Sequence, residues 1–133
     1  MPTVRVGDLD IFYATAGAGE PVLLLQGQGF GQAGLIAKNP LFRALAARYR
    51  CVTLDNRGTG GTGKPDTPYS IGQMADDAAG LLDALGIGPA HVVGGSLGGF
   101  IAEELALDRP EKVKSLVLFS TGARLPPLTR LGQ

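Results

Sequence analysis

Four short apolar runs constrain the fold of this chain more than any other feature. They are PVLLLQ at 21–26, RCVTLD at 50–55, HVVGG at 91–95 and VKSLVLFS at 113–120. Continuous apolar runs of this length, bounded by turn-forming or charged residues, are typical of strands buried on both faces. Such strands belong to parallel sheets, in which a helix connects one strand to the next.

The segments between these runs carry helical signals. Within 41–49, apolar residues recur at helical spacing. The segment SIGQMADDAAGLLDALG begins with Ser70 and has Gln73 three residues later, a capping-box pattern, and it ends at Gly86. A third helix is expected in SLGGFIAEELALDRP, directly after the run at 91–95.

This alternation of strands and helices predicts an α/β fold with a mostly parallel sheet and helices on both faces. Residues 3–15 alternate around a Gly-Asp turn and predict an N-terminal antiparallel hairpin. No linker or internal repeat divides the chain. We therefore expect a single domain over 1–133, with an irregular tail at 120–133.

The composition narrows the range of functions. Twelve basic and twelve acidic residues give zero net charge, so the sequence does not predict nucleic acid or a membrane surface as a partner. The apolar runs are too short to span a bilayer, and the N-terminus lacks the apolar stretch of a signal peptide. The single cysteine, Cys51, favours a reducing, cytoplasmic location. Nothing in the sequence indicates a metal or an organic cofactor.

The chemistry centres on Ser96, which lies in a Gly-x-Ser-x-Gly frame within AHVVGGSLGGF at 90–100. The serine falls where a buried strand turns into a helix with almost no loop. Such a turn imposes strained dihedral angles on the serine and needs glycines at close approaches, which Gly94 and Gly98 supply. The pattern predicts an activated serine nucleophile. The alternative is a glycine-rich turn that binds phosphate or has no function.

A serine that attacks a carbonyl needs two N–H donors for the negative charge that develops. One donor would be the backbone N–H of Leu97, at the start of the helix that follows. The other would be the backbone N–H of Gln28, because Gly27 and Gly29 allow the chain to turn toward the site. A plain glycine turn is the alternative for this second loop.

His91, the only histidine in the chain, is not expected to be the base for Ser96. It opens the strand that ends at the serine, so at about 3.3 Å per residue roughly 16 Å separate the two backbones. A structural role, or no special role, is expected instead. Asp55 ends a strand on the same side as Ser96 and is expected to brace its own loop. Other carboxylates fall in helices and are expected to be solvated or locally paired: Asp76, Asp77, Glu103 and Glu104.

A rival function is suggested by GTGGTGKP at 58–65, which nearly matches the nucleotide-binding pattern Gly-x-x-x-x-Gly-Lys-[Ser/Thr]. Pro65 replaces the hydroxyl residue that would bind magnesium. Pro65 and Pro68 also prevent the helix whose N-terminus should hold the phosphates. Nucleotide binding is therefore not expected.

The order QGQG, DNRGTG and GGSLGG resembles the α/β-hydrolase superfamily over residues 4–122, most closely its bacterial enol-lactonase-like and haloperoxidase-like serine hydrolases. The resemblance implies Ser96 as nucleophile, the Gln28 and Leu97 amides as oxyanion hole, and a small ester or lactone as substrate. The segment DNRGTGGTG would be the structural loop after the fourth strand. Gln26 stands where this superfamily usually has histidine.

Full-length members of that superfamily are roughly twice as long, with a helical cap and two further strands that bring the acid and the histidine. The resemblance thus implies an incomplete α/β-hydrolase fold, lacking the cap and last two strands, in which Ser96 has no base. The alternative to an enzyme is a catalytically inactive truncated form that acts as an assembly or folding unit. In either case the apolar edge strand at 113–119 is expected to be covered in a homo-oligomer or by a partner chain.

Overall fold

One sheet with helices on both sides makes up the described part of the chain, residues 3–25, 40–58, 61–64 and 69–119, in the computed structural model. The strands are β1 (Thr3–Val6), β2 (Leu9–Ala16), β3 (Pro21–Leu25), β4 (Arg50–Leu54), β5 (Ala90–Gly95) and β6 (Val113–Phe119). The helices are α2 (Pro40–Ala46), α3 (Ile71–Ala84), α4 (Leu97–Asp108) and the short 3-10 helix η1 (Pro110–Lys112). No helix in these ranges is long and apolar enough to cross a membrane.

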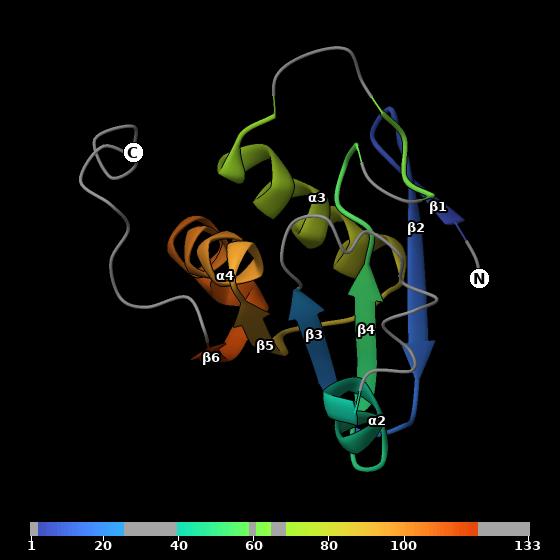
Figure 1. Ribbon diagram of the computed structural model, residues 1–133, viewed down its shortest axis with the longest axis vertical. Helices are drawn as coiled ribbons and strands as arrows, with labels where there is room; N and C mark the ends of the chain where they lie inside the picture. Colours follow the sequence, from blue (N-terminus) through green and yellow to red (C-terminus); the bar gives the residue numbers. More distant parts are fainter. Residues whose placement is uncertain (1–2, 26–39, 59–60, 65–68, 120–133) are drawn as a thin grey trace.

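The strand pairing confirms the expected α/β architecture. The sheet has six strands in the order β1-β2-β4-β3-β5-β6 (Figure 1). The antiparallel pair β1–β2 is the N-terminal hairpin, and β2 also pairs antiparallel with β4. The strands β4, β3, β5 and β6 run parallel to one another. Their carboxyl ends therefore share one edge of the sheet, here called the carboxyl edge, which is where Ser96 follows β5.

Two apolar cores lie on opposite faces of the sheet. The larger core joins β3, β4 and β5 to α3 and α4, which lie side by side over one face (Figure 1). The smaller core lies between the other face and α2, and Phe42 supplies its helix side. Successive residues of a strand point to opposite faces. In β5, accordingly, Val92 belongs to the larger core and Val93 to the smaller one.

Helix α2 is shorter than its apolar spacing predicts. The spacing indicates a helix over 41–49, whereas α2 covers only the first part of that range. The N–H of Tyr49 still donates to the carbonyl of Leu45 at 2.8 Å, but the next N–H, of Arg50, donates to the carbonyl of Glu20 at 2.9 Å. The helix ends because this second bond draws the chain into the sheet, where β4 begins.

Helix α3 begins as the sequence predicts, but one of its acidic residues does not behave as expected. Ser70 Oγ accepts the N–H of Gln73 and the Gln73 side chain accepts the N–H of Ser70, which completes the capping box. Asp77 is buried, and the Arg57 guanidinium donates to both of its carboxylate oxygens at 2.8 and 3.0 Å. The expectation of a solvated or locally paired Asp77 is wrong, because helical spacing does not reveal that the loop after β4 covers this face.

Strand β6 ends the sheet and leaves large apolar side chains exposed. Leu116, Val117 and Phe119 are 39%, 51% and 39% exposed. Within the described residues β6 pairs with β5 alone, so its outer edge carries backbone groups without a ladder partner there. An apolar strand with such an edge is a template for pairing with another chain.

Candidate active site

Ser96 occupies a sharp, strained turn between β5 and α4. Its backbone angles are φ 55° and ψ −125°, and it is the one non-glycine residue with positive φ among the described residues. A side chain disfavours this region for steric reasons, so the conformation costs about 1–3 kcal/mol and persists only where the surroundings impose it. The serine is exposed at the carboxyl edge of the sheet. The strained strand-to-helix turn expected from GGSLGG is therefore present.

The two glycines that precede Ser96 permit close approaches on opposite faces. A Cβ on Gly94 would lie 2.6 Å from the carbonyl oxygen of Gly98 and 2.9 Å from the Cβ of Ala102, both in α4. A Cβ on Gly95 would lie 2.4 Å from Cζ of the Phe119 ring. Contacts this short do not occur, so a side chain at either position would displace a structure that holds the serine in its turn.

The Ser96 hydroxyl is not used to cap the helix that it precedes. Ser96 is the N-cap residue of α4, yet its side chain makes no capping hydrogen bond. Its backbone carbonyl accepts the N–H of Gly99 at 2.9 Å, and its own N–H donates to the carbonyl of Phe119 at 3.4 Å. The N–H of Leu97 belongs to the first helical turn, where intrahelical acceptors are lacking and the helix dipole favours negative charge. The second expected donor, Gln28, lies outside the described residues.

His91 lies near the opposite end of β5 and is engaged by other residues. Its Nδ1 is 2.6 Å from Oγ of Ser115, its Nε2 is 3.4 Å from Oε1 of Glu20, and its ring meets that of Tyr49 edge-on at 6.1 Å between centroids. The ammonium of Lys114, hydrogen-bonded to Glu20, lowers the pKa of that carboxylate below its ordinary range. These contacts join His91 to three other segments at the end where the parallel strands begin, which is consistent with a structural role for the ring.

Asp55 braces the loop after β4, as the sequence predicts. Its buried carboxylate accepts the N–H of Gly61 at 2.9 Å, and its backbone carbonyl accepts the hydroxyl of Thr62 at 2.7 Å. The Thr62 oxygen in turn accepts the N–H of Phe12 in β2 at 2.9 Å. These bonds hold the loop against the hairpin, so Asp55 has a structural task.

In the described part of the rival nucleotide segment at 58–65, three glycine N–H groups are hydrogen-bonded within the protein. The N–H of Gly58 donates to the carbonyl of Gly63, that of Gly61 to Asp55, and that of Gly63 to the carbonyl of Asp10. A phosphate-binding loop directs such N–H groups at the ligand. These three donors are turned to protein acceptors, which argues against nucleotide binding here.

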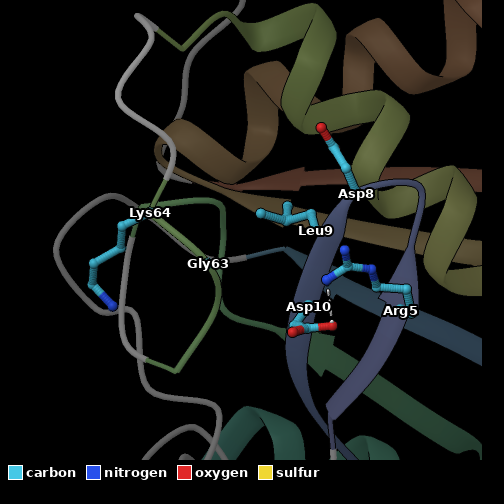
Figure 2. Close-up of a pocket in the computed structure, with 6 residues that line it drawn as sticks. All are labelled: Arg5, Asp8, Leu9, Asp10, Gly63 and Lys64. Carbon is cyan, nitrogen blue, oxygen red and sulfur yellow. Dashed lines mark hydrogen bonds and ion pairs between the residues drawn. The ribbon is translucent and has the colours of Figure 1, made fainter.

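An open depression of about 320 Å³ lies against the hairpin, away from Ser96. It is lined by Arg5, Asp8, Leu9, Asp10, Gly63 and Lys64. Figure 2 shows Arg5 paired with Asp10, at 3.0 Å, while Lys64 points away from that pair. Two basic and two acidic side chains line it, so it offers no clear preference for a charged ligand. Two strands, β4 and β3, separate the hairpin from β5 in the sheet order, so this depression is not the site at Ser96.

Phe119 is the residue near Ser96 that the sequence analysis missed. It ends β6, and its Cα is the register partner of Gly95, the residue before the serine. The signal was available: in parallel neighbours, the last residues of two strands come together at the carboxyl edge. Reading VKSLVLFS against HVVGG in this way would have placed an aromatic ring beside the serine turn.

Fold and turn together define a class of protein. A family model described as the alpha/beta hydrolase fold matches residues 21–131. This chain therefore belongs to the α/β-hydrolase fold family.

Individual relatives agree with this assignment. The chain is 46% identical over 124 residues to RutD of Azorhizobium caulinodans, named as a candidate carbamate hydrolase, a match that covers 93% of this chain and 46% of that protein. It is 42% identical over 118 residues to BpoC of Mycobacterium tuberculosis, named as a candidate non-heme bromoperoxidase, covering 88% and 44%.

Among solved structures, the enol-lactonase from Burkholderia xenovorans LB400 superposes with a TM-score of 0.85 at 29% identity, covering 94% of this chain and 48% of that one. The chain thus spans about half the length of the relatives that it matches.

Proposed function

We propose that this chain carries the nucleophile of a serine hydrolase that acts on a small carboxylic ester or lactone. The observation that carries the proposal is the backbone of Ser96, a non-glycine residue with φ 55° at the junction of β5 and α4. Strain of this kind is retained at functional sites because it presents a side chain where relaxed backbone would not. The names of the relatives, a carbamate hydrolase and an enol-lactonase among them, supply the substrate class: a carbonyl bonded to a heteroatom.

In the proposed reaction Oγ of Ser96 attacks the carbonyl carbon of the substrate and the carbonyl oxygen becomes negatively charged. The backbone N–H groups of Leu97 and Gln28 would stabilise that oxygen, with the dipole of α4 adding to the effect at Leu97. The alcohol part of the substrate then leaves with a proton, and water releases the acyl group from the serine. None of these steps requires a metal or an organic cofactor.

A base for Ser96 is the component that we propose to lie outside these 133 residues. The chain has one histidine, His91. Its ring is hydrogen-bonded to Ser115 and faces Glu20 near the amino end of β5. The acid and the histidine of a complete triad would then come from further residues of the protein or from another chain. We also propose a cytoplasmic location, consistent with the unpaired thiol of Cys51.

The competing proposal is a non-catalytic assembly or folding unit, which would also account for the exposed apolar side chains of β6. In both proposals a second copy or a partner chain pairs with the outer backbone edge of β6 at 113–119. Light scattering of the purified chain tests this part: an oligomer is expected. A soluble monomer that is stable at high concentration would contradict it.

Hydrolysis of p-nitrophenyl esters by the wild type and Ser96→Ala separates the two proposals. Without a base, an oxyanion hole and binding still leave about 10³–10⁴-fold catalysis over water in serine hydrolases. Slow ester hydrolysis above the rate in buffer is therefore expected of a hydrolase site, at a similar rate in the wild type and in Ser96→Ala, because this remainder does not depend on the serine. A rate equal to that in buffer would favour the non-catalytic unit, and strong turnover that depends on Ser96 would contradict the absence of a base.

A further inference from the structure

The ring of Phe119 lies directly against the backbone of the serine turn. Three ring atoms, Cζ, Cε2 and Cε1, would come within 2.4, 2.6 and 3.1 Å of a Cβ built on Gly95. Since Cβ lies about 1.5 Å from Cα, the tip of the ring touches the Gly95 backbone. The Cα of Ser96 is one trans peptide, about 3.8 Å, further along. The ring is thus the apolar group placed next to the serine by the sheet itself.

Packing against Gly95 covers only part of the Phe119 ring. Phe119 remains 39% exposed although its tip is in contact with Gly95. The backbone of Phe119 is held by two independent features, the β5–β6 register and the bond from the Ser96 N–H to its carbonyl oxygen at 3.4 Å. An aromatic residue whose backbone is held in place and whose ring is exposed on one side is suited to contact a hydrocarbon group.

Val117 provides a contrast within the same strand. It is on the same face of β6 as Phe119, since residues two apart in a strand share a face. It is 51% exposed, and its register partner is Val93, two residues further from the serine than Gly95. Any effect that depends on proximity to Ser96 should therefore appear at Phe119 and not at Val117.

We infer that the phenyl ring of Phe119 is a specificity determinant that contacts the hydrocarbon substituent on the acyl carbon of the substrate. This inference rests on Ser96 being the nucleophile. Once Oγ of Ser96 is bonded to the acyl carbon, the acyl group stays beside the serine while the alcohol departs. A ring that packs against the residue before Ser96 therefore meets the acyl part, and an aromatic surface favours longer apolar acyl groups over short ones.

Alkylboronic acids test the contact without requiring turnover. Oγ of Ser96 forms a bond to boron, its hydroxyl proton passes to water, and boron keeps both of its hydroxyl groups and becomes negatively charged. Calorimetric titration gives the affinities for hexylboronic and ethylboronic acid, and their ratio measures the alkyl contact. The proteins compared are the wild type, Phe119→Ala, Phe119→Leu, Val117→Ala and Ser96→Ala.

The wild type should bind the hexyl compound more tightly, and Phe119→Ala should lower the hexyl-to-ethyl ratio by about four- to fifteenfold, as expected for losing contact with one or two methylene groups. Phe119→Leu should retain part of the ratio, and Val117→Ala should leave it unchanged. An unchanged ratio in a folded Phe119→Ala, or an equal fall in Val117→Ala, would overturn the inference alone. Binding that is absent from the wild type, or unaffected by Ser96→Ala, would overturn the proposed nucleophile and the inference with it.

Discussion

At the scale of single residues, the two glycines before Ser96 have different tasks although they are adjacent. Gly94 faces backbone atoms and a Cβ of α4, which cannot move without moving the helix. Gly95 faces the far end of the Phe119 ring, and that ring is partly exposed. The turn therefore packs against rigid helix atoms on the side of Gly94 and against a movable side chain on the side of Gly95.

We expect Gly94→Ala to destabilise the protein by about 2–3 kcal/mol, the upper part of the range for overpacking. Gly95→Ala should cost at least about 1 kcal/mol less, because the ring can swing away. Urea unfolding followed by circular dichroism measures both. The double variant Gly95→Ala with Phe119→Ala is the control and should be no less stable than Phe119→Ala alone. Equal costs at the two glycines would show that the ring does not yield.

Cys51 gives a pH dependence at the same scale. Burial in the smaller core raises the pKa of its thiol from 9.0 to about 12. The unfolded chain therefore loses this proton at lower pH than the folded one, so the stabilisation is complete below pH 9 and is lost as the pH rises toward 12. The free energy of unfolding should fall by about 1 kcal/mol more between pH 8 and pH 10 in the wild type than in Cys51→Val. Parallel pH profiles of the two proteins would contradict this.

At the scale of elements, the pair of Arg57 and Asp77 attaches α3 to the loop after β4. The two side chains are 13% and 8% exposed and share two hydrogen bonds, which raise the pKa of the guanidinium above its ordinary value. The same loop is bonded to the hairpin through Thr62. One loop therefore connects a helix, the hairpin and the end of a central strand.

Removing one partner of this pair leaves the other buried without its counter-charge. Arg57→Ala should lower the free energy of unfolding by about 3 kcal/mol. The matched control is Arg5→Ala, because Arg5 pairs with Asp10 but both side chains are 62% exposed, and a change within about 0.5 kcal/mol is expected there. Thermal unfolding of both variants measures the difference. Similar losses in the two variants would mean that Arg57 is no more than a surface charge.

The elements themselves could largely be predicted from the sequence, because each carries a local signal. Buried strands appear as apolar runs in the sequence, and the capping box predicts the start of α3. The end of α2 and the partner of Asp77 could not be predicted, because both depend on segments that are distant in sequence and adjacent only in the fold. The same limit applies at the site. GGSLGG predicts the turn at Ser96, but the ring of Phe119 comes from another strand and is found only through the β5–β6 register.

At the scale of the whole molecule, the parallel sheet separates the two candidate components of a catalytic pair. Ser96 follows the carboxyl end of β5, whereas His91 lies near its amino end, and the two ends of a parallel strand open on opposite edges of the sheet. His91 is instead hydrogen-bonded to another serine, Ser115, at 2.6 Å. The strained serine, Ser96, thus has no histidine beside it. The one histidine, His91, lies beside Ser115, which is in a regular strand.

The site of labelling by a fluorophosphonate tests most directly which of these serines is the nucleophile. The chain has four serines, Ser70, Ser96, Ser115 and Ser120, and peptide mass spectrometry identifies the one that is modified. Because no base in this chain activates Ser96, the account predicts slow labelling at Ser96 that is abolished in Ser96→Ala and unchanged in His91→Ala. Labelling at Ser115, or labelling of any serine that is lost in His91→Ala, would contradict it.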